Sequence, residues 1–240
     1  MRRSHPRRRA LAGKVAQTRG VGFRDLAAAL GRGELVYDRV FDAVFPESIR
    51  RASSVHWTPV EVALRAAQLL TQGVASPVLL DVGAGVGKFC TIAAASARAK
   101  VHGVEHRKHF VEIAQQAAEK LGVEVLYTHG TIVDHVLPDM TGVYLFNPFG
   151  ENLASRDDHL DDSVELNESA YWRSIFAVER LLAGAAEGTR VVTYCGWGGA
   201  MPAGYELVLR EGRCGKIELW KKAGDGGPST PTNVRQAAPQ

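Results

Sequence analysis

Three glycines and an acidic residue stand close together in the stretch LLDVGAGVGKF, residues 79–89. Asp81 lies where an apolar run ends, and Gly83, Gly85 and Gly87 leave a length of backbone without side chains. Glycine tolerates positive φ and lets a ligand approach the main chain, and a helix beginning here would offer free N–H groups. The stretch therefore predicts either a tight strand-to-helix turn or a turn against which a ligand lies.

The spacing of these glycines differs from the dinucleotide fingerprint G-x-G-x-x-G, because Gly87 comes one position early. An anion two residues before the turn, Asp81, suits a cationic group better than a pyrophosphate. A second acid, Glu105, ends the expected strand KVHGVEH, residues 100–106. An acid at about this distance from the turn can bind two ribose hydroxyls. A solvated loop acid is the alternative for Glu105.

A further group of candidates follows another expected strand, in YLFNPFGEN, residues 144–152. Asn147 can accept and donate hydrogen bonds, and Phe149 offers a flat face to a substrate or a sulfonium. Pro148 would stiffen the turn between them. The alternative is a plain loop in which Asn147 caps the turn.

Acidic residues dominate the next stretch, SRDDHLDDSVELNES, residues 155–169. Such a stretch is either solvated surface or a pocket wall that favours a cationic or amine acceptor. It would repel the phosphates of a nucleic acid, which counts against an RNA or DNA acceptor.

Strand-like and helix-like patterns alternate along the chain and predict a doubly wound α/β fold. We expect a seven-stranded, mostly parallel sheet covered on both faces, with an antiparallel C-terminal hairpin and helical N-terminal additions. Its ligand site would lie at the carboxyl ends of the strands. The expected strands are residues 77–82, 100–106, 123–130, 142–149, 188–196, 204–212 and 215–222. The expected helices are residues 23–30, 34–45, 57–73, 87–97, 107–122 and 169–184.

The helix at residues 57–73 carries explicit start and stop signals. Thr58 is expected to act as its N-cap, Pro59 to occupy its first position and Gly73 to close its C-terminus.

Charge is distributed unevenly between the ends of the chain and its centre. Residues 1–20 carry seven basic residues and no acid, which leaves 22 basic residues (29 − 7) against 26 acidic ones in the remainder. We expect a basic disordered arm at 1–20, a single domain at 21–222, and a disordered Gly- and Pro-rich tail at 223–240. The arm is either solubilising or rests on nucleic acid or another polyanion.

Several classes of protein are disfavoured by composition. No apolar run reaches the roughly 18 residues that cross a bilayer. The three cysteines, Cys90, Cys195 and Cys214, form no CxxC pair. We therefore expect neither a membrane span nor a metal site, and a reducing, cytoplasmic location.

The stretches LLDVGAGVGKF and VHGVEH together resemble the first two motifs of the class I S-adenosylmethionine-dependent methyltransferases, over roughly residues 54–222. The resemblance implies that Gly83, Gly85 and the backbone beside them line the methionine part of S-adenosyl-L-methionine. Asp81 would face the amino end of the cofactor, directly or through water, and Glu105 would hold the ribose hydroxyls.

The resemblance extends to three looser segments. THGTIVD, residues 128–134, stands where the family places an adenine-contacting loop, with Thr131 where an acid is common. VHWTP, residues 55–59, stands where some members pack a segment over the cofactor. YLFNPFGEN is similar to the Asn-Pro-Pro-aromatic motif of methyltransferases that act on amino groups of adenine or glutamine. In that motif the Asn and a backbone carbonyl hold the target nitrogen and the aromatic stacks on it; this chain lacks the second proline and has its aromatic one position earlier.

These observations predict a methyltransferase that uses S-adenosyl-L-methionine to methylate a nitrogen or oxygen nucleophile. The expected acceptor is a small-molecule or protein amine or hydroxyl, with nucleic acid binding only through the basic arm. A nicotinamide-dependent oxidoreductase and a non-catalytic scaffold that keeps the cofactor fold are the alternatives. The candidate catalytic residues are Asn147 and Phe149. The candidate cofactor-binding residues are Thr58, Asp81, Gly83, Gly85, Gly87, Glu105, Thr131 and Asn147.

Overall fold

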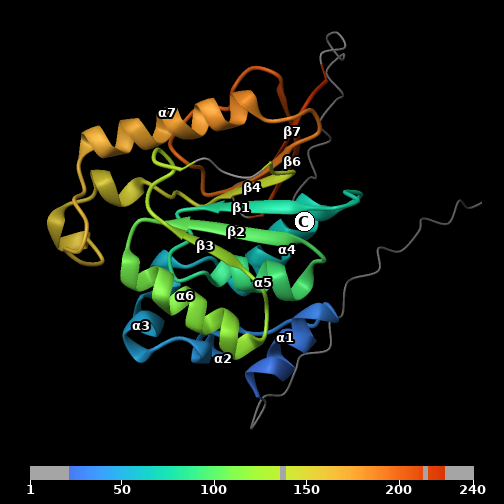
Figure 1. Cartoon of the computed structure of the whole chain (residues 1–240), viewed down its shortest axis with the longest axis vertical. Helices are drawn as coiled ribbons and strands as arrows, with labels where there is room; N and C mark the ends of the chain where they lie inside the picture. The colour runs from blue at the N-terminus through green and yellow to red at the C-terminus, as the bar shows by residue number, and fades with distance from the viewer. Residues whose placement is uncertain (1–21, 136–138, 213–215, 225–240) are drawn as a thin grey trace, which may run out of the picture.

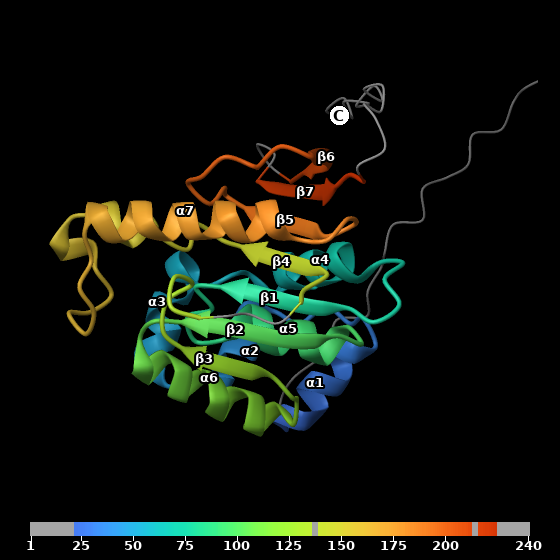
Figure 2. The same cartoon turned by 45° about the horizontal axis from the view of Figure 1, so that its top comes forward.

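A seven-stranded sheet with the strand order β3-β2-β1-β4-β5-β7-β6 forms the centre of the protein (Figures 1 and 2). The computed structural model describes residues 22–135, 139–212 and 216–224. The strands are β1 Val78–Val82, β2 Lys100–Glu105, β3 Leu126–His129, β4 Gly142–Leu145, β5 Arg190–Tyr194, β6 Tyr205–Glu211 and β7 Ile217–Lys222. Strands β1 to β5 pair in parallel, and β7 is antiparallel to both β5 and β6. The predicted mostly parallel sheet with an antiparallel C-terminal hairpin is confirmed.

Helices cover the two faces of this sheet unequally. The helices are α1 Phe23–Gly31, α2 Asp38–Phe41, α3 Glu47–His56, α4 Val60–Thr71, α5 Lys88–Ser96, α6 Lys108–Leu121 and α7 Glu168–Gly184. Short 3₁₀ turns, η1 Asp42–Val44, η2 Gly150–Leu153 and η3 Arg156–Asp158, lie between them. Figure 1 shows α5 and α6 on one side of the sheet and α7 on the other.

Successive side chains along each strand point to opposite faces of the sheet and pack into two separate hydrophobic cores. Leu79 and Tyr144 join the core beneath α1, α4, α5 and α6, whereas Leu80 and Val143 join the core beneath α7. The described part of the connection between β3 and β4 contains no helix, so Leu126 on β3 is left 62% exposed. Coverage of both faces, as predicted, is therefore complete only near the centre of the sheet.

The N-terminal helices differ from the prediction. A helix over residues 34–45 is wrong: the chain forms the four-residue helix α2 and then tightens into the 3₁₀ turn η1. This arrangement brings Asp38 and Asp42 to the buried ammonium group of Lys88, at 2.6 and 2.7 Å. The helix α3 that follows was not predicted.

The start of α4 also differs from the prediction. Thr58 is not its N-cap, because the cap position is Pro59 and no side chain of its own segment bonds there. The Thr58 hydroxyl lies 3.1 Å from the hydroxyl of Tyr144, and the Asp38 carboxylate accepts the Val60 N–H at 3.0 Å instead. Gly73 follows the last turn with a φ of +74°, as expected of a closing glycine.

The carboxyl ends of the parallel strands meet at one edge of the sheet. In Figure 2 the arrows of β1, β2 and β4 point to this edge, and residues 150–167 lie beyond it. The predicted basic arm and residues 225–240 of the predicted tail lie outside the described residues. Among the residues that are described, no helix has both the length and the apolar character needed to cross a membrane.

Candidate cofactor site

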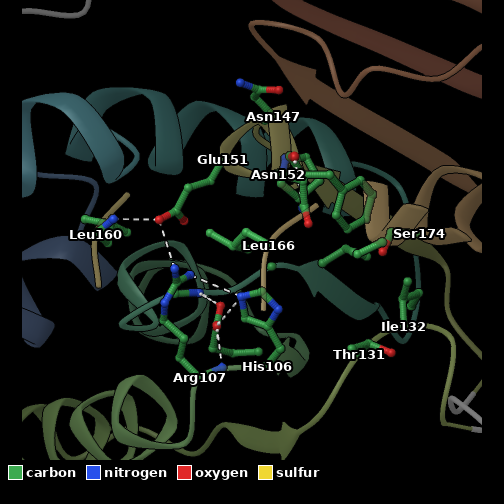
Figure 3. A pocket seen from close by; sticks show the side chains of 18 of the residues that line it. His106, Arg107, Thr131, Ile132, Asn147, Glu151, Asn152, Leu160, Leu166 and Ser174 are labelled. Atoms are coloured by element: carbon green, nitrogen blue, oxygen red, sulfur yellow. Dashed lines mark hydrogen bonds and ion pairs between the residues drawn. The ribbon is translucent and has the colours of Figure 1, made fainter. Parts of the chain in front are cut away.

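A cavity of about 490 Å³ lies at the carboxyl edge of the sheet (Figure 3). Its walls come from the glycine turn after β1, the end of β2, the loop after β3, residues 146–152 after β4, the acidic stretch and the start of α7. Ligand sites of doubly wound sheets are expected at this edge, and the volume is within the usual range for small-molecule sites.

The glycine turn forms one wall of this cavity. Gly83 and Gly85 both line it and have φ values of +72° and +55°. A Cβ atom at Gly83 would lie 2.8 Å from Cβ of Pro148, and one at Gly85 would lie 2.7 Å from Cζ3 of Trp57. Both glycines are therefore required by their backbone conformation and by close neighbours. A ligand that reaches Gly85 must lie beside the indole of Trp57, which also lines the cavity.

Two of the predicted cofactor-binding residues, Asp81 and Gly87, do not line the cavity. Gly87 begins α5, and a Cβ there would collide with Tyr127. Asp81 is 4% exposed, and its carboxylate accepts a hydrogen bond from the Cys90 thiol at 3.2 Å. Burial raises the pKa of Asp81 to about 7; the Cys90 hydrogen bond opposes this rise and the charge of Glu105 adds to it.

Glu105 joins the end of β2 to the glycine turn. Its Oε2 accepts the N–H of Gly85 at 2.9 Å, and its Oε1 accepts the N–H of Arg107 at 2.8 Å. The carboxylate is 6% exposed and lines the cavity. The structure thus brings together the bare backbone and the second acid that the sequence singled out.

Thr131 and Thr58 have different positions. Thr131 lines the cavity, but its hydroxyl donates to the Asp134 carboxylate at 2.6 Å and accepts the Val133 N–H at 3.2 Å. Thr58 is buried against Tyr144 and is not among the lining residues.

The segment after β4 places Asn147 at the rim of the cavity and Phe149 in its wall. Asn147 has a φ of +38°, and its N–H donates to the Gly196 carbonyl at 2.9 Å. Its side chain is exposed, and Figure 3 shows the amide directed away from the centre of the cavity. Phe149 is 8% exposed and packs with the core beneath α7.

A buried arginine in the wall was not predicted. Arg107 is 4% exposed and forms ion pairs with Glu151 at 2.9 Å and with Asp161 at 3.1 Å. One of its guanidinium nitrogens lies 3.1 Å from Nε2 of His106, a ring whose pKa is lowered chiefly by burial. His106 therefore accepts at Nε2 as a neutral imidazole.

The acidic stretch combines the two alternatives left open by the sequence. All four of the acids Asp157, Asp158, Asp162 and Glu165 are exposed, but only Asp158 and Glu165 line the cavity. Within the described residues, no group of three or more His, Cys, Asp or Glu side chains could hold a metal ion.

Comparisons with known proteins give a structural match. No family model and no curated protein matches the chain. An RNA methyltransferase from Salinibacter ruber, solved with S-adenosyl-L-homocysteine, superposes with a TM-score of 0.50 at 20% identity, over 72% of this chain and 97% of that chain. TrmN from Thermus thermophilus has a TM-score of 0.50 at 17% identity, over 72% of this chain and 52% of that one. This chain has the Rossmann-like fold of the class I methyltransferases.

The methyltransferase fold differs from the dinucleotide-binding fold at one end of the sheet. Dinucleotide-binding sheets are mostly parallel and have the strand order 3-2-1-4-5-6. Here β7 lies between β5 and β6 and is antiparallel to both. The strand order and the glycine spacing therefore both depart from the nicotinamide-dependent alternative.

Proposed function

We propose that the chain is a methyltransferase that binds S-adenosyl-L-methionine in this cavity and methylates a nitrogen or oxygen nucleophile. One observation carries the proposal: the carboxylate of Glu105 and the bare backbone of Gly83 and Gly85 line a single cavity at the carboxyl edge of a methyltransferase fold. The N–H of Gly85 already donates to Glu105 at 2.9 Å, so the two elements are adjacent.

The cavity residues fit the chemistry of this cofactor. Glu105 offers a carboxylate that can accept hydrogen bonds from ribose hydroxyls, and Gly83 and Gly85 offer main chain that a ligand can touch. Glu105, Glu151, Asp158 and Glu165 in the wall outnumber the cations, which favours a positively charged ligand. S-adenosylmethionine supplies a methyl group on a sulfonium, so the protein has mainly to align the acceptor and exclude water.

The acceptor would lie at the end of the cavity formed by residues 146–152. Asn147 can hold a target nitrogen or oxygen after a rotation of its exposed side chain, and Phe149 supplies a flat apolar wall. A small-molecule or protein amine or hydroxyl suits this acid-rich rim better than a nucleic acid. Asn147→Ala should lower the turnover number about tenfold or more at saturating cofactor while the affinity for S-adenosylhomocysteine stays unchanged. An equal loss of both would make Asn147 a structural residue.

Equilibrium binding tests the cofactor assignment. Isothermal titration calorimetry should detect S-adenosylhomocysteine binding to the full chain and no binding of NAD. Binding of NAD alone would contradict the proposal. Binding of S-adenosylhomocysteine without methyl transfer to any amine, hydroxyl or protein acceptor would favour the scaffold alternative.

A matched pair of glycine variants locates the site. Gly85 and Gly73 both have positive φ, but a Cβ at Gly85 meets Trp57 and a Cβ at Gly73 meets nothing within 4 Å. Both Gly85→Ala and Gly73→Ala should lose roughly 1–3 kcal/mol of stability from backbone strain. Only Gly85→Ala should lose S-adenosylhomocysteine binding. Equal binding by the two variants would place the ligand elsewhere.

A further inference from the structure

One wall of the cavity is a segment with little means of holding itself in place. Residues 150–167, here called the acidic segment, contain six carboxylates and a single arginine. Neither of its 3₁₀ turns, η2 and η3, contains a buried residue. Its like charges repel one another, and the apolar burial that opposes that repulsion is limited, with Leu160 partly buried against the main core. An interaction from outside the segment is needed to keep it against the cavity.

Arg107 provides such an interaction at two positions of the segment, Glu151 and Asp161, and His109 lies 3.1 Å from Asp161 as well. The Nη2 of Arg107 lies 2.9 Å from Oε1 of Glu151, and its Nε lies 3.1 Å from Oδ1 of Asp161. The same oxygen of Glu151 accepts the N–H of Leu160 at 2.6 Å, so these two parts of the segment are also joined to each other. Figure 3 shows the Arg107, Glu151 and Leu160 contacts as one connected set.

Because Arg107 is buried, the loss of its ion pairs would be costly. The guanidinium group is 4% exposed and stands 5.5 Å from the ring centroid of Phe110. A buried guanidinium that lost both carboxylates would be a buried charge without compensation. Burial alone would raise the pKa of Asp161, but hydrogen bonds from Ser163 and Arg107 outweigh burial and lower this pKa to about 2. The ion pair between Arg107 and Asp161 therefore persists through mildly acidic pH.

Arg107 also belongs to the ligand-facing edge of β2. Its backbone N–H donates to Oε1 of Glu105 at 2.8 Å, which fixes the carboxylate assigned above to the ribose. Arg107 thus contacts Glu105 through its backbone and the acidic segment through its side chain.

We propose that Arg107 is a positioning residue that holds the acidic segment in place as a wall of the cofactor cavity. The inference rests on the proposed function for the identity of the ligand, but not for the contact between Arg107 and the segment. It predicts that loss of the guanidinium releases residues 151–162 and weakens cofactor binding, while the sheet remains intact.

Hydrogen–deuterium exchange of the full chain, without ligand, tests the structural half of the proposal. In Arg107→Met, amides of residues 151–162, including Leu160, should exchange about tenfold faster or more, while amides of β4 and β5 keep wild-type protection. Arg156→Met is the matched control, because Arg156 pairs with Asp162 in the same segment but both side chains are more than 70% exposed (81% and 75%). It should leave exchange unchanged within about twofold.

Binding of S-adenosylhomocysteine tests the functional half. The dissociation constant should rise about tenfold or more in Arg107→Met and stay unchanged in Arg156→Met. Arg107→Lys keeps the charge without the two-pronged contact and should give intermediate exchange and affinity. If Arg107→Met does not fold, Glu151→Gln and Asp161→Asn each remove one of the two ion pairs of Arg107 and should show smaller changes in the same direction.

The outcomes separate the two proposals. Wild-type protection of residues 151–162 in Arg107→Met, or equal effects of Arg107→Met and Arg156→Met, would overturn the positioning role. A wild-type protein that binds no S-adenosylhomocysteine would contradict the proposed function, whereas the exchange comparison would still decide whether Arg107 holds the segment.

Discussion

Two buried cations, Lys88 and Arg107, are each paired with two acids but hold different structures. Lys88 begins α5, is 2% exposed, and lies 2.6 Å from Asp38 and 2.7 Å from Asp42. Arg107 follows β2, is 4% exposed, and pairs with Glu151 and Asp161. Each therefore joins the carboxyl edge of the sheet to a segment far away in the sequence.

The segments that they hold differ in apolar burial. The partners of Lys88 belong to α2 and η1, where Phe41 and Val44, and Phe45 directly after them, are buried in the main core. The partners of Arg107 belong to the acidic segment, whose 3₁₀ turns bury nothing. Lys88 is thus part of the cooperative core, and its loss should destabilise the whole fold. The loss of Arg107 should instead destabilise only the acidic segment beside the cavity.

Removing the Lys88 ammonium group should have the largest effect on stability. Lys88→Met leaves Asp42, 8% exposed, without its cation, so we expect a loss of about 3–5 kcal/mol in the free energy of unfolding. Urea denaturation followed by circular dichroism measures it. Lys108→Met removes an exposed lysine from the first turn of α6 and is the control. A change within about 0.5 kcal/mol for both variants would show that Lys88 is not part of the cooperative core.

The same contrast explains which parts of the site the sequence could predict. The glycine turn and Glu105 were predictable because their pattern is local: apolar run, turn residues, helix, then an acid at the end of the next strand. The partners of Arg107 lie 44 and 54 residues away, and no spacing rule connects residues so distant. An arginine after the strand and acids in a loop look like separate surface charges until the fold brings them together.

The fold shows a similar division. Strand and helix periodicity was sufficient for the sheet and its antiparallel end. It failed in the N-terminal region, where Thr58 was expected to cap α4 and Asp38, 22 residues before Val60, accepts the hydrogen bond instead. The helix α3 was missed because its sequence, ESIRRASSVH, offers few apolar residues to define a buried face. Its own sequence pattern is therefore not sufficient to predict it.

Asp81 sharpens the comparison because it is a buried charge paired with a thiol instead of a cation. Its folded pKa of about 7 lies above the value of about 4 expected in the unfolded chain. The folded state therefore binds the proton more tightly than the unfolded state. Protonation of Asp81 therefore makes its full contribution to the free energy of unfolding below about pH 4, and this contribution is lost as the pH rises through 7.

Asparagine at this position has no proton to lose. The free energy of unfolding of Asp81→Asn, relative to that of wild type, should therefore rise by about 2–3 kcal/mol between pH 5 and pH 8. Urea denaturation at pH 5, 6.5 and 8 measures the difference, and Asp157→Asn, at an exposed position, is the control. Parallel pH profiles for wild type and Asp81→Asn would mean that Asp81 ionises as an ordinary carboxyl group.

Glu105 connects the two regions, because it accepts the Gly85 N–H on one side and the Arg107 N–H on the other. Glu105→Ala should weaken S-adenosylhomocysteine binding by about 1.5–3 kcal/mol, the usual loss for hydrogen bonds to a charged group. Calorimetry measures this loss of affinity, with Glu112→Ala on the exposed side of α6 as control.

The side chain of Arg107 keeps both of its carboxylate partners in Glu105→Ala, so residues 151–162 should retain wild-type exchange. Unchanged affinity would remove Glu105 from the cofactor site, and released residues 151–162 would show that the backbone of Arg107, and not only its guanidinium, supports the acidic segment.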